Sequence, residues 1–311
     1  MISETVTPLV PSEDSPRETK PKPITIGFNL DLLKAFGMLM GSVMLVAGLA
    51  ITKAKIFPGD GSYGNRHEFP KLIEETYIRQ MFHMSHTCLF IDFTPARDVA
   101  ALLISFFTLP LMIFTYVNHR RIEEDKRKDP VEWYSLYLFS KYTWLFRVLC
   151  LGFFFMVFVN SPDGVYKDPN SMSVSELIAD DGWWKFQKHY FFYFLYQFAM
   201  ALLCIESSWQ HYKKNDHPFL TRKFLWYYNL VTFVWLAYYT LWIVTFQFGL
   251  PFPGHTNEND AIGFSSWRWV WANFIMLGYD VLTVIAPGIV ALWYSQHYPE
   301  KMVISFELKQ D

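Results

Sequence analysis

The chain has 311 residues, of which 52% are hydrophobic and 19% aromatic, and its formal net charge is −2. This apolar and aromatic content exceeds what a soluble core of this size needs, and several windows approach the roughly 20 apolar residues that cross a bilayer. The near-neutral charge argues against a nucleic-acid partner. We therefore predict an all-α, polytopic membrane protein, a bundle of about six transmembrane helices.

Six apolar segments within residues 27–295 are the predicted transmembrane helices. They run approximately over Leu32–Ile51, Val99–Val117, Tyr142–Val159, Tyr190–Ile205, Phe224–Phe248 and Trp267–Trp293. The third helix either begins near Tyr142 or has an amphipathic lead-in from Val131. Residues 1–26 are rich in Ser, Pro, Glu and Lys and are predicted to be a disordered tail, and residues 296–311 form a short second tail. The segment 78–93 is too polar for a clear span, and it either crosses the bilayer, lies on it or re-enters it.

Two local patterns refine the first two helices. Gly37 and Gly41 have the small-xxx-small spacing that permits close helix contact, although a chance pair in a glycine-rich helix explains the spacing equally well. The second helix is followed by a charged stretch, Asn118–Pro130, which is predicted to be a connector.

The distribution of Lys and Arg predicts the orientation in the membrane. With both termini and the connectors after the second and fourth helices on one side, that side carries 15 Lys and Arg residues and the other side 10. Positive residues are enriched on the cytoplasmic side, so both termini are predicted to be cytoplasmic. The sequence does not indicate which membrane this is.

Three ionisable residues fall within or at the end of predicted spans. They are Arg147 in the third helix, Glu206 at the end of the fourth and Asp280 in the sixth. A charge in lipid costs roughly 3 kcal/mol or more unless it is paired, so Arg147 is expected to reach Glu206 or Asp280. The pair then either fixes helix packing or serves transport or proton relay.

One face of the predicted fourth helix carries polar and sulfur-containing side chains. His189, Tyr193, Tyr196, Gln197, Met200 and Cys204 recur at steps of three and four residues. This stripe either packs against polar groups of other helices or lines a substrate cavity. In a cavity, His189 could act as general base for a hydroxyl nucleophile, with Thr87 and Ser85 as the candidates.

Metal and cofactor signals are weak. His83 and His86 share a helix face with Asp92 nearby, a set that could hold a metal, but no second histidine pair follows, and we predict no metal site. The chain has no Cys-x-x-Cys, P-loop or dinucleotide fingerprint, so no cofactor is predicted.

The order of several motifs resembles the androgen-induced, rolling-stone-like group of six-helix membrane proteins. The resemblance covers about two-thirds of the chain, and the residues that carry it are Thr87 and Phe90-Ile91-Asp92, Gly182-Trp183 before His189, Glu206, His217-Pro218 with Arg222, and Pro251-Phe252-Pro253. Some members of that group hydrolyse fatty acid esters of hydroxy fatty acids. The resemblance implies Thr87 as nucleophile and His189 as base.

Three hypotheses follow for function. The first is a lipid-handling membrane protein, in its sharpest form a hydrolase of long-chain fatty esters acting at the outer half of the bundle. The second is a transporter or channel in which Arg147 and Asp280 gate a polar path. The third is a non-catalytic subunit whose charged connector and tails dock other membrane subunits.

Overall fold

The computed structural model describes residues 24–56, 96–159, 181–215, 218–247, 278, 280–297 and 301–306. The helices are α1 (Leu30–Ile56), α4 (Ala96–Lys128), α5 (Pro130–Gly152), a 3₁₀ turn η2 (Phe153–Phe155), α6 (Met156–Val159), α8 (Asp181–Lys214), α9 (Arg222–Gln247), a π-helical segment η4 (Asp280–Ile285) and α11 (Ala286–His297). The described part of the chain is thus almost entirely helical, as predicted.

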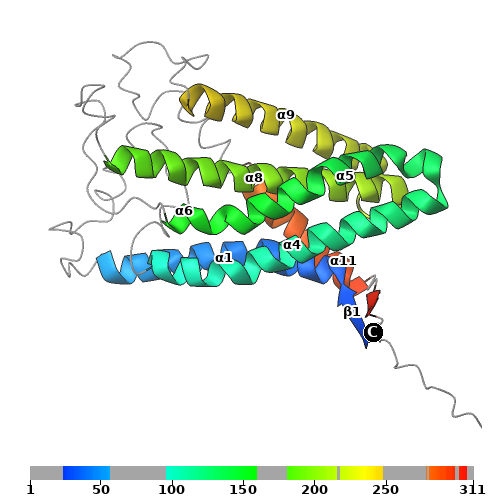
Figure 1. Cartoon of the computed structure of the whole chain (residues 1–311), viewed down its shortest axis with the longest axis horizontal. Helices are drawn as coiled ribbons and strands as arrows, with labels where there is room; N and C mark the ends of the chain where they lie inside the picture. The colour runs from blue at the N-terminus through cyan, green and yellow to red at the C-terminus, as the bar shows by residue number, and fades with distance from the viewer. Residues whose placement is uncertain are drawn as a thin grey trace, which may run out of the picture. The chain divides into compact units, whose positions relative to one another are not determined.

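Neighbours in sequence pack side by side. α1 lies along α4, α4 along α5, α5 along α8 and α8 along α9, while α11 returns to pack on α1 (Figure 1). Short connections between α4 and α5 and between α8 and α9 make these pairs antiparallel. α9 packs mainly on α8 and leaves much of its own surface uncovered.

Four helical stretches are long and apolar enough to cross a membrane. They are Leu30–Gly48, Arg97–Lys128, Pro130–Phe158 and Phe191–Lys214. On α4, Leu102, Phe106 and Leu109 are exposed, whereas Phe107 and Leu111 on the opposite face are buried. Such an apolar outer face is unusual for a soluble monomer and ordinary beside lipid. These four stretches support a membrane protein, and a bundle of six spans stays a prediction.

The charged stretch Asn118–Pro130 is not a loop, contrary to the prediction. α4 continues through it to Lys128. Glu123 accepts from Arg120 at 2.5 Å and from Arg127 at 3.1 Å, and Asp125 pairs with Lys128 at 3.8 Å. Such pairs at i+3 and i+4 stabilise a helix in water. At about 1.5 Å per residue α4 is about 50 Å long, more than a bilayer core of about 30 Å, so its charged end can extend beyond the membrane.

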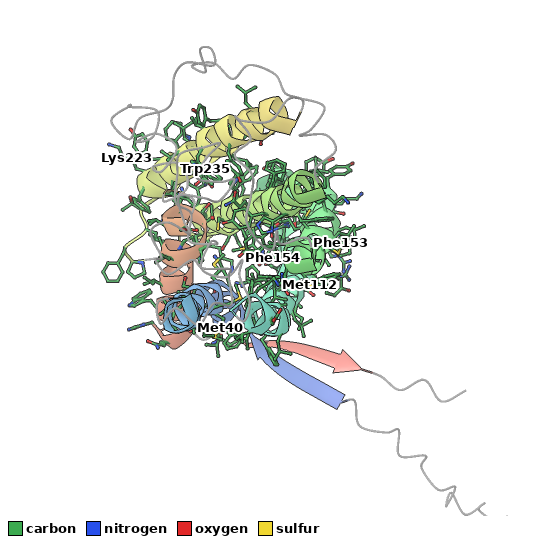
Figure 2. All side chains as sticks on the ribbon, turned by 90° about the vertical axis from the view of Figure 1, so that its left-hand side faces the viewer. Met40, Met112, Phe153, Phe154, Lys223 and Trp235 are labelled. Atoms are coloured by element: carbon green, nitrogen blue, oxygen red, sulfur yellow. The ribbon has the colours of Figure 1, made fainter. Side chains whose placement is uncertain are left out.

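The third helix begins at Pro130, so it includes the amphipathic lead-in from Val131. The Asp129 side chain caps it by accepting from the Glu132 backbone N–H at 3.0 Å, and Pro130 occupies the first turn, where a missing N–H costs nothing. After Gly152 the helix tightens into η2. Phe154 then points into the bundle while Phe153 points out, 4% and 49% exposed (Figure 2).

Only one glycine of the Gly37-x-x-x-Gly41 pair lies at a helix contact. A Cβ on Gly37 would be 2.5 Å from Leu111 Cγ and 2.9 Å from the Phe107 carbonyl oxygen, whereas a Cβ on Gly41 would meet nothing within 4 Å. Gly37 therefore permits the close approach of α1 to α4. Gly288 has the same role between α11 and α1, where a Cβ would be 2.9 Å from Leu39 Cδ2.

Two short strands depart from the all-α prediction. β1 (Ile24–Asn29) and β2 (Lys301–Phe306) form a two-stranded sheet. Their β-branched and aromatic residues favour extended structure. The sheet joins segments that were predicted as parts of the two tails, so the predicted boundary at residue 26 falls inside β1.

Candidate functional site

A buried ion pair joins α5 to α8. Arg147 Nη2 donates to Glu206 Oε2 at 2.5 Å, and both side chains are fully buried. Asn118 of α4 donates to the other carboxylate oxygen at 2.9 Å. Each carboxylate oxygen thus has a donor from a different helix, which compensates for removing the charge from water. Of the two partners considered for Arg147, the structure has Glu206, and Asp280 lies half-buried at the start of η4.

A second buried cation lies beside this pair. Lys34 of α1 donates through Nζ to Ser207 Oγ at 2.6 Å, and its Nζ lies 5.8 Å from the centroid of the Phe114 ring. Lys34 is only 5% exposed. With Arg147, Glu206 and Asn118 it forms a buried polar cluster to which α1, α4, α5 and α8 each contribute.

The contacts of the buried polar cluster are those of a structural ion pair that holds helices together. Arg147 also donates through Nε to the Thr143 carbonyl at 3.4 Å, and its buried Nη1 has no hydrogen-bond partner in the described part of the chain. Guanidinium stays charged in proteins, so this side chain requires Glu206 to stay in place. The sequence analysis missed the roles of Asn118 and Lys34. It placed Asn118 in the charged connector and used Lys34 only in counting the positive residues on the cytoplasmic side. The available signal was a polar amide or ammonium group next to an apolar run.

His189 is anchored inside the bundle. Its Nδ1 lies 2.9 Å from the Val157 carbonyl oxygen of α6, and the residue is 1% exposed. A carbonyl only accepts hydrogen bonds, so in the neutral ring Nδ1 carries the proton and Nε2 is the basic nitrogen. The ring is therefore held in the tautomer that a general base acting through Nε2 needs.

The rest of the stripe on α8 is buried among other helices. Tyr196 stacks on Phe154 with ring centroids 3.9 Å apart, and Phe107 meets Tyr196 edge-on at 6.5 Å. Tyr193 and Gln197 are also buried. Both polar atoms of the Gln197 amide lack a hydrogen-bond partner among the residues that the structure describes. In the part of the chain that the structure describes, these side chains thus pack against neighbouring helices, and Tyr196 does so against aromatic rings; a substrate cavity along the stripe stays a prediction.

The remaining predicted site residues lie outside the described residues. They are the candidate nucleophiles Thr87 and Ser85 and the weak metal candidates His83, His86 and Asp92. That His189 lies within hydrogen-bond reach of a hydroxyl nucleophile therefore stays a prediction. Within the described ranges no group of three or more His, Cys, Asp or Glu residues could hold a metal ion.

The π-helical segment η4 offers two backbone carbonyls to neighbouring helices. Tyr228 of α9 donates its hydroxyl to the Leu282 carbonyl at 2.6 Å, and Cys204 of α8 donates its thiol to the Thr283 carbonyl at 3.3 Å. A π segment widens the helix and disturbs the regular backbone hydrogen bonds, so carbonyls become available to side chains. These two contacts fix α8 and α9 against η4.

A groove opens between the last turns of α8 and the first turns of α9. Its volume is about 400 Å³. We call it the α8–α9 groove. It is lined by Ile205, Trp209 and Tyr212 of α8 and by Trp226, Asn229, Leu230 and Phe233 of α9. Ser208 donates to Asn229 Oδ1 at 2.5 Å, which leaves the two amide donors on Nδ2. The groove is therefore mainly aromatic with one amide.

No protein-family model matches the chain, and no curated protein or solved structure is significantly similar to it. The resemblance to the androgen-induced, rolling-stone-like group therefore stays a prediction from the residues that carry it.

Proposed function

We propose that this chain is a multi-pass integral membrane protein, with both termini cytoplasmic, that handles membrane lipid by binding it in the α8–α9 groove. The observation that carries the proposal is the groove itself. Its volume of about 400 Å³ falls within the roughly 300–1,000 Å³ of ligand sites, which are typically apolar and aromatic with a few polar groups. Six of its seven lining residues are aromatic or aliphatic, and Asn229 supplies the polar group.

The exposure of α9 supports a lipid rather than a water-soluble ligand. Trp226, Leu230 and Phe233 line the groove and are 53%, 44% and 63% exposed. In a membrane these side chains would face acyl chains, so a lipid could enter the groove sideways without leaving the bilayer. Trp235, on the buried face of α9 (Figure 2), stacks on Tyr239 of the same helix with ring centroids 5.1 Å apart, and Tyr239 in turn contacts Phe194 of α8 at 5.7 Å.

A groove-filling variant and a matched neighbour test the proposal. The full chain in nanodiscs is labelled with a photoactivatable diacyl glycerophospholipid, and the labelled peptides are identified by mass spectrometry. Leu230→Trp fills the groove, whereas Val231→Trp introduces the same indole side chain at an exposed position that does not line it. We expect labelling of groove peptides to fall about tenfold in Leu230→Trp, as for a contact worth about 1.4 kcal/mol, and to persist in Val231→Trp. Equal labelling in both variants would refute the proposal.

A second candidate function is hydrolysis of a long-chain ester, with His189 as base and Thr87 as nucleophile. The observation that favours it is the hydrogen bond between His189 Nδ1 and the Val157 carbonyl, which assigns the lone pair to Nε2. His189→Asn keeps a donor near the Nδ1 position and removes Nε2. If the hydrolase hypothesis holds, His189→Asn and Thr87→Ala each abolish ester turnover while the protein stays folded. Wild-type protein that turns over no long-chain ester would exclude this function.

A further inference from the structure

The α8–α9 groove ends at a cationic turn. Arg222, the first residue of α9, donates through Nε to the Tyr212 carbonyl at 3.2 Å, and its guanidinium carbon lies 5.7 Å from the centroid of the Tyr212 ring. Tyr212 lines the groove. Arginine has five N–H donors and this hydrogen bond uses one. Arg222 is therefore anchored at the mouth of the groove, in an exposed position.

Three further cations lie close to Arg222 in sequence. Lys213 and Lys214 end α8, and Lys223 follows Arg222 in α9 on the outer side of the helix (Figure 2). The stretch 207–223 contains these four Lys and Arg residues and a single acid, Asp216. Its formal charge is therefore strongly positive.

Arg222 caps the last turn of α8 through its bond to the Tyr212 carbonyl, but the stability of α9 itself does not account for Arg222 and Lys223. Lysines in the last turn of α8 complement the negative end of the helix dipole, but Arg222 and Lys223 lie in the first turn of α9, where the dipole disfavours positive charge. The first turn of α9 has no acidic residue. A negatively charged occupant at the mouth of the groove would compensate both residues.

The position of these cations relative to the membrane specifies the occupant. The apolar stretch Phe191–Lys214 ends at the turn, so in a membrane that this stretch crosses the cations would lie at the level of the lipid head groups and the aromatic groove would extend toward the acyl chains. Arginine binds phosphate bidentately. A zwitterionic lipid would bring a second, positive group toward the cluster, whereas an anionic lipid would not.

We propose that the α8–α9 groove selects an anionic phospholipid, whose acyl chain occupies the aromatic groove and whose phosphate is bound by Arg222 and Lys223. This inference rests on the proposed lipid-binding function and names its lipid class.

The test measures competition for the photoactivatable lipid in nanodiscs containing the full chain. Phosphatidylglycerol and phosphatidylcholine with identical acyl chains are the two competitors. We expect phosphatidylglycerol to compete about tenfold better in the wild type, in line with the attraction of anionic lipid for two Lys or Arg residues at the surface. Arg222→Gln/Lys223→Gln should abolish this preference. The control, Arg127→Gln/Lys128→Gln, removes two exposed cations at the end of α4 and should keep it.

The outcomes separate this inference from the proposed function. If the groove is labelled but both competitors act equally in the wild type, or the preference survives Arg222→Gln/Lys223→Gln, the anionic selectivity is wrong and lipid binding stands. If the control loses the preference as well, selectivity comes from overall surface charge and the site assignment is wrong. If groove peptides are not labelled at all, the proposed function fails together with this inference.

Discussion

Replacement of Glu206 by methionine should be among the most destabilising single changes in the described part of the chain. Glu206 is fully buried, and it accepts from Arg147 at 2.5 Å and from Asn118 at 2.9 Å. Methionine has a similar volume, so the change removes the carboxylate without opening a large cavity. It leaves the Arg147 guanidinium buried without a counter-charge.

The magnitude follows from what each partner loses. Breaking a buried ion pair by removing one member costs about 3–5 kcal/mol. The cost is asymmetric because guanidinium cannot lose its proton, whereas a buried carboxylate can become neutral. We therefore expect Glu206→Met to cost more than Arg147→Met. The double variant Arg147→Met/Glu206→Met should cost less than Glu206→Met alone, because it removes both charges.

Equilibrium unfolding of the purified chain in mixed micelles with increasing sodium dodecyl sulfate measures these free energies. The chain contains 12 Trp residues, so intrinsic fluorescence reports the transition. The reasoning is refuted if Glu206→Met costs less than about 1 kcal/mol, the range of an exposed pair. It is also refuted if the free energies of the two single changes simply add in the double variant, since coupled residues do not behave additively.

Three further predictions use the same unfolding measurement. Gly37→Ala should cost about 1–3 kcal/mol, because its Cβ would overlap Leu111, whereas Gly41→Ala should be neutral or slightly stabilising; equal effects would exclude a special role for Gly37. Tyr228→Phe should cost about 1–2 kcal/mol by removing the donor to the Leu282 carbonyl, and the exposed neighbour Tyr227→Phe should change little. Gln197→Met should be neutral or stabilising, since both polar atoms of this buried amide lack a partner within the described ranges; a loss above about 1 kcal/mol would show that the amide is bonded.

The length of the apolar runs and the cost of burying charge were sufficient to predict most of the helices and a partner for Arg147. A backbone in lipid must satisfy its own hydrogen bonds, so long apolar runs predicted helices where α1, α4, α5, α8 and α9 lie. The cost of an unpaired charge predicted a partner for Arg147, and the sequence limited the choice to Glu206 or Asp280. These inferences depend on local composition, which the sequence contains in full.

Helix ends in the charged regions were decided by competing local effects. The polarity of Asn118–Pro130 predicted a connector. Ion pairs at i+3 and i+4 around Glu123 instead keep α4 helical to Lys128. Polarity alone does not separate a loop from a solvated helix.

Other features depend on which surfaces meet, and only the tertiary structure decides that. Gly37 and Gly41 are equivalent in spacing, but α4 approaches α1 at Gly37 alone. Lys34 and Asn118 became members of the buried polar cluster because α1 and α4 bring them to Ser207 and Glu206, far away in sequence. The α8–α9 groove likewise exists because α9 packs against α8. Contacts between distant segments have no local signature, since their free energy comes from packing in three dimensions.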